Sequence, residues 1–110
     1  MRAIHAAGVD AVEPGWMGPF LASLARDDLA TATLRGYRYD LRHFLAWHRT
    51  VQDMDFAVED ITEYELIAYR QHMVAGGRRP ATVNRRLGAL RRLCRWARGQ
   101  RASAPEPALA

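Results

Sequence analysis

The stretch RRPATVNRRLGALRRLCRWAR, residues 78–98, decides the fold predicted for this chain. Pro80 suits the first turn of a helix, and no later proline or glycine pair interrupts the stretch before Gly99. With about 100° of rotation per residue, one arc of this helix is apolar and its neighbour is cationic. The apolar arc holds Val83, Leu87, Leu90, Leu93, Cys94 and Ala97, and the cationic arc holds Arg85, Arg91, Arg92, Arg95 and Arg98. Arg86 is the exception, because it falls among the apolar positions.

Charge is strongly segregated along the chain. Residues 78–101 hold nine arginines and no acid, whereas residues 1–77 hold seven arginines and eleven acids. The cations are all arginine, which a coding-composition bias explains as well as phosphate binding does. Their clustering is more informative, because a basic segment on an otherwise acidic chain favours a polyanionic partner.

Three further segments have helical periodicity, so that helices are expected at residues 19–27, 31–49, 62–75 and 80–99. The second places Arg35, Arg38 and Arg42 beside an apolar arc, where they are either a second binding stripe or solvated arginines flanking the core. A capping box at Thr62–Glu65 opens the third helix, and Gly76-Gly77 ends it. Short joints without a strand pattern predict an all-α, compact four-helix bundle-like domain.

The length fits one domain, predicted at residues 16–100. Residues 1–15 are expected to form a flexible N-terminal arm, and the Ala/Pro-rich residues 101–110 a linker. Cys94 is the only cysteine and suits a buried position in a reducing, cytoplasmic setting. No segment is apolar enough for a signal peptide or a membrane span.

Several spaced motifs resemble one family. They are Phe20-Leu21-x-x-Leu24, then Thr33-Leu34-x-x-Tyr37-x-x-Asp40-Leu41-x-x-Phe44-x-x-Trp47, and finally Pro80-Ala81-Thr82-Val83-Asn84-Arg85-Arg86-Leu87-x-x-Leu90-Arg91. In order and spacing they resemble the N-terminal core-binding, SAM-like domain of tyrosine recombinases, the phage-integrase family. Ala30 and Arg79 depart from the serine N-caps that are frequent in that family.

The resemblance implies a four-helix domain that binds double-stranded DNA at recombination sites, with its second and fourth helices crossing the major groove. Catalytic arginines, histidines and the tyrosine nucleophile lie in a separate C-terminal domain in such proteins. We therefore expect no catalysis from this chain, a linker toward a catalytic domain absent from it, and a parent tyrosine recombinase acting in DNA integration or recombination. The chain alone is expected to be a monomer, and the parent a tetramer on DNA.

Within the predicted interface, side chains have different expected roles. Arg78 and Arg79 lie at the positive end of the helix dipole, where a phosphate would reverse an unfavourable interaction. Thr82, Asn84 and Arg85 are placed to approach base edges. Phosphate contacts are expected from Arg91, Arg92 and Arg95, and the other half of the reading surface is expected from Arg35, Arg38 and Arg42 on the second helix.

Other kinds of site lack support in the sequence. The four histidines have no zinc-site spacing, no glycine-rich phosphate loop appears, and neither a metal nor a cofactor is expected. One alternative function is a helical protein–protein interaction domain whose basic face docks on an acidic partner, or on residues 51–65 of another copy. RNA binding is a third possibility, although no exposed aromatic pair suggests base stacking.

Overall fold

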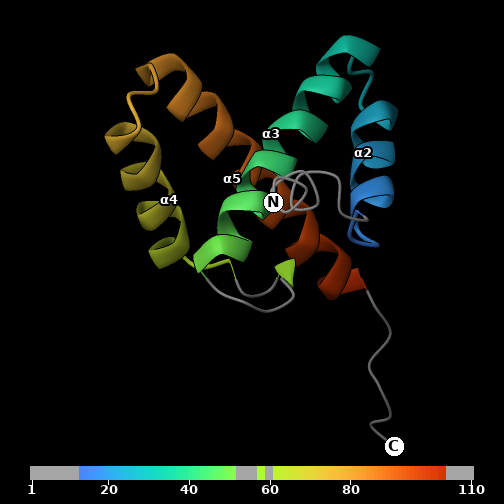
Figure 1. Ribbon diagram of the computed structural model, residues 1–110. Coiled ribbons are helices and arrows are strands. Elements are labelled where there is room, and N and C mark those ends of the chain that lie inside the picture. Colours follow the sequence, from blue (N-terminus) through green and yellow to red (C-terminus); the bar gives the residue numbers. More distant parts are fainter. Residues whose placement is uncertain (1–12, 52–56, 59–60, 104–110) are drawn as a thin grey trace, which may run out of the picture.

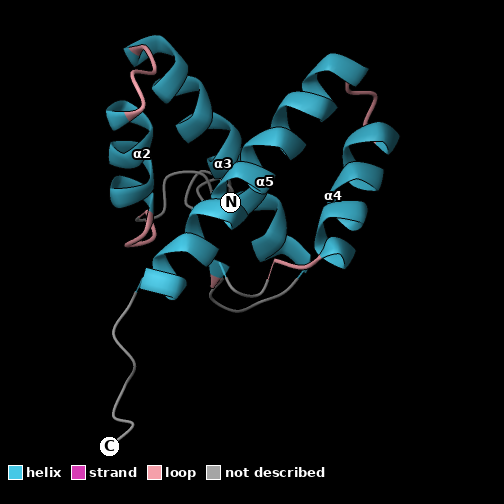
Figure 2. Ribbon diagram, turned by 180° about the vertical axis from the view of Figure 1, so that it is seen from behind, coloured by secondary structure: helices cyan, strands magenta, loops and turns pink. Residues whose placement is uncertain are grey.

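A computed structural model describes residues 13–51, 57–58 and 61–103, with side chains as far as residue 100. These residues form four helices and no strand: α2 (Met17–Arg26), α3 (Thr31–Val51), α4 (Glu63–Ala75) and α5 (Pro80–Ser103). The long helices α3 and α5 cross each other, while α2 and α4 lie on opposite sides of the crossing (Figure 1, and from behind in Figure 2). The predicted all-α, four-helix architecture is confirmed.

The helix boundaries differ slightly from the prediction. α2 begins at Met17 rather than at residue 19, and the Met17 side chain is completely buried. Pro19 is still within the first turn, where a proline costs no hydrogen bond. α5 continues through Gly99 to Ser103, because a single glycine weakens a helix by only about 1 kcal/mol without ending it.

The turns after α2 and α4 use the same hydrogen-bond motif. Each has one residue in the left-handed region, Asp28 at φ 65° and Gly77 at φ 81°. After α4, the amide of Arg78 donates to the Met73 carbonyl while that of Gly77 donates to Val74. After α2, the amide of Leu29 donates to the Leu24 carbonyl while the amide of Asp28 donates to the Ala25 carbonyl. Both turns are therefore Schellman caps, which stop the helix and reverse the chain sharply.

One hydrophobic core joins the four helices. The apolar arc of α5 is buried as predicted at Val83, Leu87, Leu90 and Leu93, and Cys94 is half-buried beside it. The rest of the core comes mainly from α2, α3 and α4, at Met17, Phe20, Leu21, Leu24, Leu41, Phe44, Leu45, Val58, Leu66, Tyr69 and Met73. This packing fixes which faces of α3 and α5 remain exposed, and hence where a ligand can bind.

Parts of the predicted arm and linker, residues 1–12 and 104–110, lie outside the described residues, as does most of the connection between α3 and α4. Among the helices that the structure describes, none has the length and apolar character needed to cross a membrane.

Candidate nucleic-acid interface

A groove runs between the exposed faces of α3 and α5. Its volume is about 520 Å³, and α3 contributes Thr33, Gly36, Tyr37 and Asp40 to its lining. From α5 come Arg85, Gly88, Ala89, Arg92 and Arg95. Three of the predicted contact residues, Arg85, Arg92 and Arg95, are thus brought together along one wall.

Two glycines in helix interiors face this groove, Gly36 and Gly88. A Cβ atom added at either position would meet no atom within 4 Å. Packing of the domain against itself therefore does not require glycine at these positions. Each costs about 1 kcal/mol of helix stability relative to alanine. The absence of these side chains leaves room for a ligand to approach both helix backbones.

Asp40 holds Arg85 at the crossing of the two helices. Arg85 donates from Nε and Nη2 to the two carboxylate oxygens of Asp40, each at 2.9 Å. Asp40 is only 4% exposed, whereas the Arg85 side chain is 57% exposed. The hydrogen bond from Arg85 to the carboxylate is the main cause of the raised pKa of Arg85. One face of the guanidinium is therefore fixed by a buried acid while the rest remains open to a ligand.

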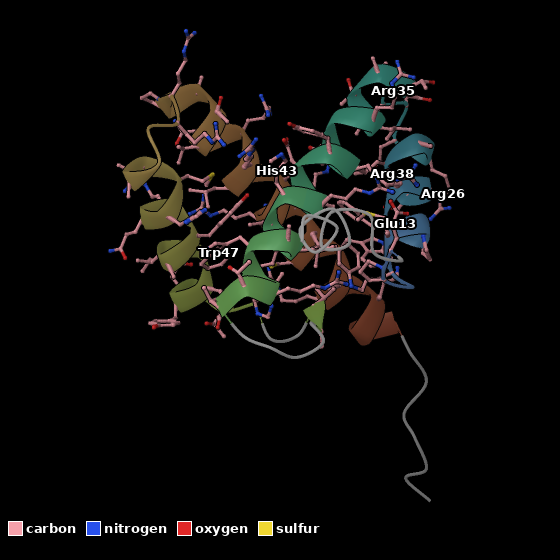
Figure 3. The ribbon with its side chains drawn as sticks, viewed as in Figure 1. Glu13, Arg26, Arg35, Arg38, His43 and Trp47 are labelled. Atoms are coloured by element: carbon pink, nitrogen blue, oxygen red, sulfur yellow. The ribbon has the colours of Figure 1, made fainter. Side chains whose placement is uncertain are left out.

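The arginines of α3 lie on the other flank of its exposed face. At about 100° per residue, Arg38 and Arg42 are roughly half a turn away from the groove-lining residues of the same helix. Both contact the Glu13 carboxylate, from Arg38 Nε at 3.1 Å and from Arg42 Nη2 at 2.8 Å. Figure 3 shows Arg38 and Glu13 on the side of α3 toward α2, and His43 on the side toward α5. The α3 stripe therefore does not enter the groove.

The remaining predicted residues are dispersed around the groove. Arg91 lines a separate hollow of about 300 Å³ beside the first turn of α4. Arg78 lies at the junction of α3, α4 and α5, and Arg92 is also 3.4 Å from Asp27 at the end of α2. Arg35, Arg79 and Asn84 are exposed, and Thr82 is half-buried. Within the described residues, Arg35, Arg78, Arg79, Arg91 and Arg95 have no ion pair.

Three residues of the interface were missed by sequence reasoning. Asp40 and Glu13 hold the arginines, but their partners are distant in the sequence and only the folded chain reveals them. Tyr39 is 56% exposed, and its ring lies edge-on to His43 at 4.7 Å. An exposed aromatic residue among the arginine positions of α3 was the available indication.

Burial raises the pKa of the Cys94 thiol, which makes it a poor nucleophile. No cluster of His, Cys, Asp or Glu among the described side chains could hold a metal ion. The arrangement is suited to holding an anion by charge and shape.

Comparison with known families gives one match. The model of the phage integrase N-terminal SAM-like domain matches residues 19–101. No curated protein and no solved structure matches the chain.

Proposed function

This chain belongs to the phage integrase N-terminal SAM-like domain family, and we propose that it binds double-stranded DNA at recombination sites through the α3–α5 groove. In this role the chain is the part of a tyrosine recombinase that holds DNA. Its residues carry out no chemical step, and the reaction belongs to another domain of the parent protein.

The main support for this proposal is the pair of glycines that line the groove. Gly36 and Gly88 face each other's helix across the groove, and neither is required by internal packing. A sugar-phosphate strand is a polyanion that can approach a helix backbone closely, and Arg85, Arg92 and Arg95 line the α5 wall of the space where it would lie. The two glycines, which weaken their helices, thus lie in the same groove as three arginines.

Some residues of the proposed interface position the domain on DNA, and others read the base sequence. Arg92, which lies 3.4 Å from Asp27, and Arg95 neutralise phosphates, which fixes the register of the domain without reading bases. Arg85 is held by Asp40, so it loses less freedom on binding than an unheld arginine would. Asn84 is exposed on the first turns of α5 and has the donor and acceptor pair that suits adenine.

A salt-titrated fluorescence anisotropy assay on duplex DNA tests this function. If about six phosphates are contacted, log affinity falls against log salt with a slope near −5. Undetectable binding at low salt would overturn the proposal. Equal affinity for heparin and for duplex DNA would instead favour a basic face that docks on an acidic protein.

A Gly88→Ala variant tests whether the open space at the groove glycines is used for DNA binding. Because the added methyl group has open space, we expect the free energy of unfolding to rise by about 1 kcal/mol. Duplex affinity should fall roughly fivefold, since the methyl group occupies the path of the strand. Gly99→Ala on the same helix is the matched control: it gains the same helix stability, and its affinity for DNA should not change. If the two variants behave alike in both the unfolding and the DNA-binding assay, the groove is not part of the interface.

A further inference from the structure

A second cavity lies where α3, α4 and α5 meet. Its volume is about 200 Å³. It is lined by His43 and Trp47 of α3, Tyr69 and His72 of α4, Arg78 of the turn that follows α4, and Arg86 of α5. Figure 3 shows His43 on the side of α3 that faces α5, and Trp47 between α3 and α4. The proposed groove ends at Asp40 and Arg85, so this cavity is the next space along the same two helices.

Two buried donors at this cavity have no acceptor. They are the Nε of Arg86 and the O–H proton of Tyr69, whose oxygen lies beside the Arg86 guanidinium and interacts with it. Arg86 is 7% exposed and Tyr69 is 2% exposed. Buried donors without partners are costly, and most proteins avoid them. A ligand oxygen within the cavity would supply the missing acceptor.

Charge around the cavity is unbalanced. Asp40 is the acid nearest to Arg86, but its oxygen is 3.7 Å from Arg86 Nε, beyond hydrogen-bond distance. Both oxygens of Asp40 already accept from Arg85 at 2.9 Å. Arg85 and Arg86 therefore share one carboxylate, Arg78 beside them has no ion pair within the described residues, and the excess charge is positive. The pKa of His43 is lowered first by burial and then by the charges of Arg86 and Arg78, while the charge of Asp40 acts in the opposite direction.

We propose that this cavity binds a single phosphate group. Guanidinium groups match phosphate oxygens in geometry as well as in charge, and the Tyr69 hydroxyl can donate to a further oxygen. The volume suits a tetrahedral oxyanion, since it exceeds the roughly 30 Å³ share of one water several-fold. It is smaller than the roughly 300–1,000 Å³ of pockets that hold larger organic ligands. The phosphate comes either from a DNA strand, in which case the inference rests on the proposed function, or from free inorganic phosphate.

Titration with inorganic phosphate tests the site without DNA. The observable is the set of imidazole resonances of His43 and His72, followed by NMR against sodium chloride at the same ionic strength. We expect saturable shifts at both histidines with phosphate and not with chloride. Shifts that grow linearly, or that are equal in the two salts, would overturn the proposal.

Two variants locate the anion. Tyr69→Phe removes a buried hydroxyl whose proton has no acceptor in the free protein and whose oxygen interacts with Arg86, so the thermal midpoint should change little. Its phosphate affinity should fall about tenfold, because a hydrogen bond to a charged group is lost. Arg78→Gln should weaken phosphate binding severalfold, whereas Arg70→Gln, an equal charge change at an exposed α4 position outside the cavity, should leave it unchanged. Equal effects of the two arginine variants, or an unchanged phosphate affinity in Tyr69→Phe, would contradict the site.

Duplex DNA then distinguishes the two sources. If a DNA phosphate occupies the cavity, Tyr69→Phe also weakens duplex binding and inorganic phosphate competes with the duplex beyond its effect on ionic strength. If free phosphate is the ligand, Tyr69→Phe leaves duplex affinity unchanged while its phosphate titration is still impaired. Failure of the DNA-binding function gives a different result, in which the histidines respond to phosphate but no duplex binds.

Discussion

The two arginine stripes of this domain look alike in the sequence and differ in the structure. On α5, Arg85 is held by Asp40, a buried acid on the facing helix. On α3, Arg38 and Arg42 are held by Glu13, which precedes the first described helix and is part of no helix itself. Both acids neutralise arginines, but only one of them belongs to the core.

The difference gives the two acids opposite roles toward an anionic ligand. Asp40 is buried and accepts from Arg85 through both of its oxygens, so it fixes the direction of Arg85 while the outer part of that side chain stays accessible. Glu13 holds its arginines at the surface, where a phosphate can take the place of its carboxylate. We therefore expect Asp40 to support binding and Glu13 to compete with it.

The largest expected effect is on stability in Asp40→Asn. This change removes the negative charge beside Arg85 and Arg86 and leaves the buried Arg86 without a counter-charge. Breaking a buried ion pair costs roughly 3–5 kcal/mol, and we expect about 3 kcal/mol because Arg85 is largely exposed. Urea unfolding followed by circular dichroism measures the loss.

Glu13→Gln is the matched comparison for stability. Its pairs are with side chains that are 44% exposed, and surface pairs contribute roughly 0–1 kcal/mol. The free energy of unfolding should therefore change by less than about 1 kcal/mol. Comparable losses in both variants would contradict the distinction between a core acid and a surface acid.

Glu13→Gln should nevertheless strengthen duplex binding. A carboxylate about 4 Å from a phosphate repels it by about 1 kcal/mol even in water, so its removal should raise affinity roughly fivefold. The gain should shrink as salt is added, because the groups are exposed. Anisotropy at several salt concentrations measures both quantities.

The control for Glu13→Gln is Asp28→Asn. It removes the same charge at the exposed residue in the turn after α2, and asparagine accepts a φ of 65° about as readily as aspartate. We expect less than about a twofold change in affinity, since separated surface charges are screened. If Asp28→Asn strengthens binding as much as Glu13→Gln does, net charge alone accounts for the gain and Glu13 has no specific role.

The helices were predictable from the sequence because their determinants are local. The apolar arc of α5, the capping box at Thr62 and the glycine pair after α4 each act within a few residues, and the structure confirms all three. The turn after α2 was less evident, since Asp28 adopts the left-handed conformation that Gly77 adopts more easily. The start of α2 differs from the predicted one because burial of the Met17 side chain outweighs the weak local preference for a start at residue 19.

The arrangement of the interface was less predictable because it depends on contacts distant in the sequence. Arg85 was expected at a DNA base, and nothing near it in the chain indicates that Asp40, on another helix, holds it. Arg86 did give an indication, because a cation among apolar positions requires a buried partner or an open cavity. Periodicity placed both arginine stripes correctly on helix surfaces, but only the crossing of α3 and α5 decides which stripe faces the groove.

The smallest expected effect is on the pH dependence of stability, and it tests whether burial and the neighbouring arginines oppose the protonation of His43. His43 is faced by Arg78, Arg85, Arg86 and Asp40, and its pKa is lowered chiefly by burial and then by Arg86. An unfolded histidine titrates near pH 6.5, so just below that value the unfolded chain binds more protons than the folded one. Stability should therefore rise with pH through the range below about 6.5 and lose this contribution to the slope above it.

His43→Gln removes the titrating group and keeps a neutral polar side chain. Urea unfolding of both proteins between about pH 5 and 8 should show a shallower acid-side slope in the variant, while the contributions of the other histidines cancel in the comparison. Identical slopes would mean that the folded protein does not lower the pKa of His43, so that neither its burial nor the arginines beside it oppose its protonation.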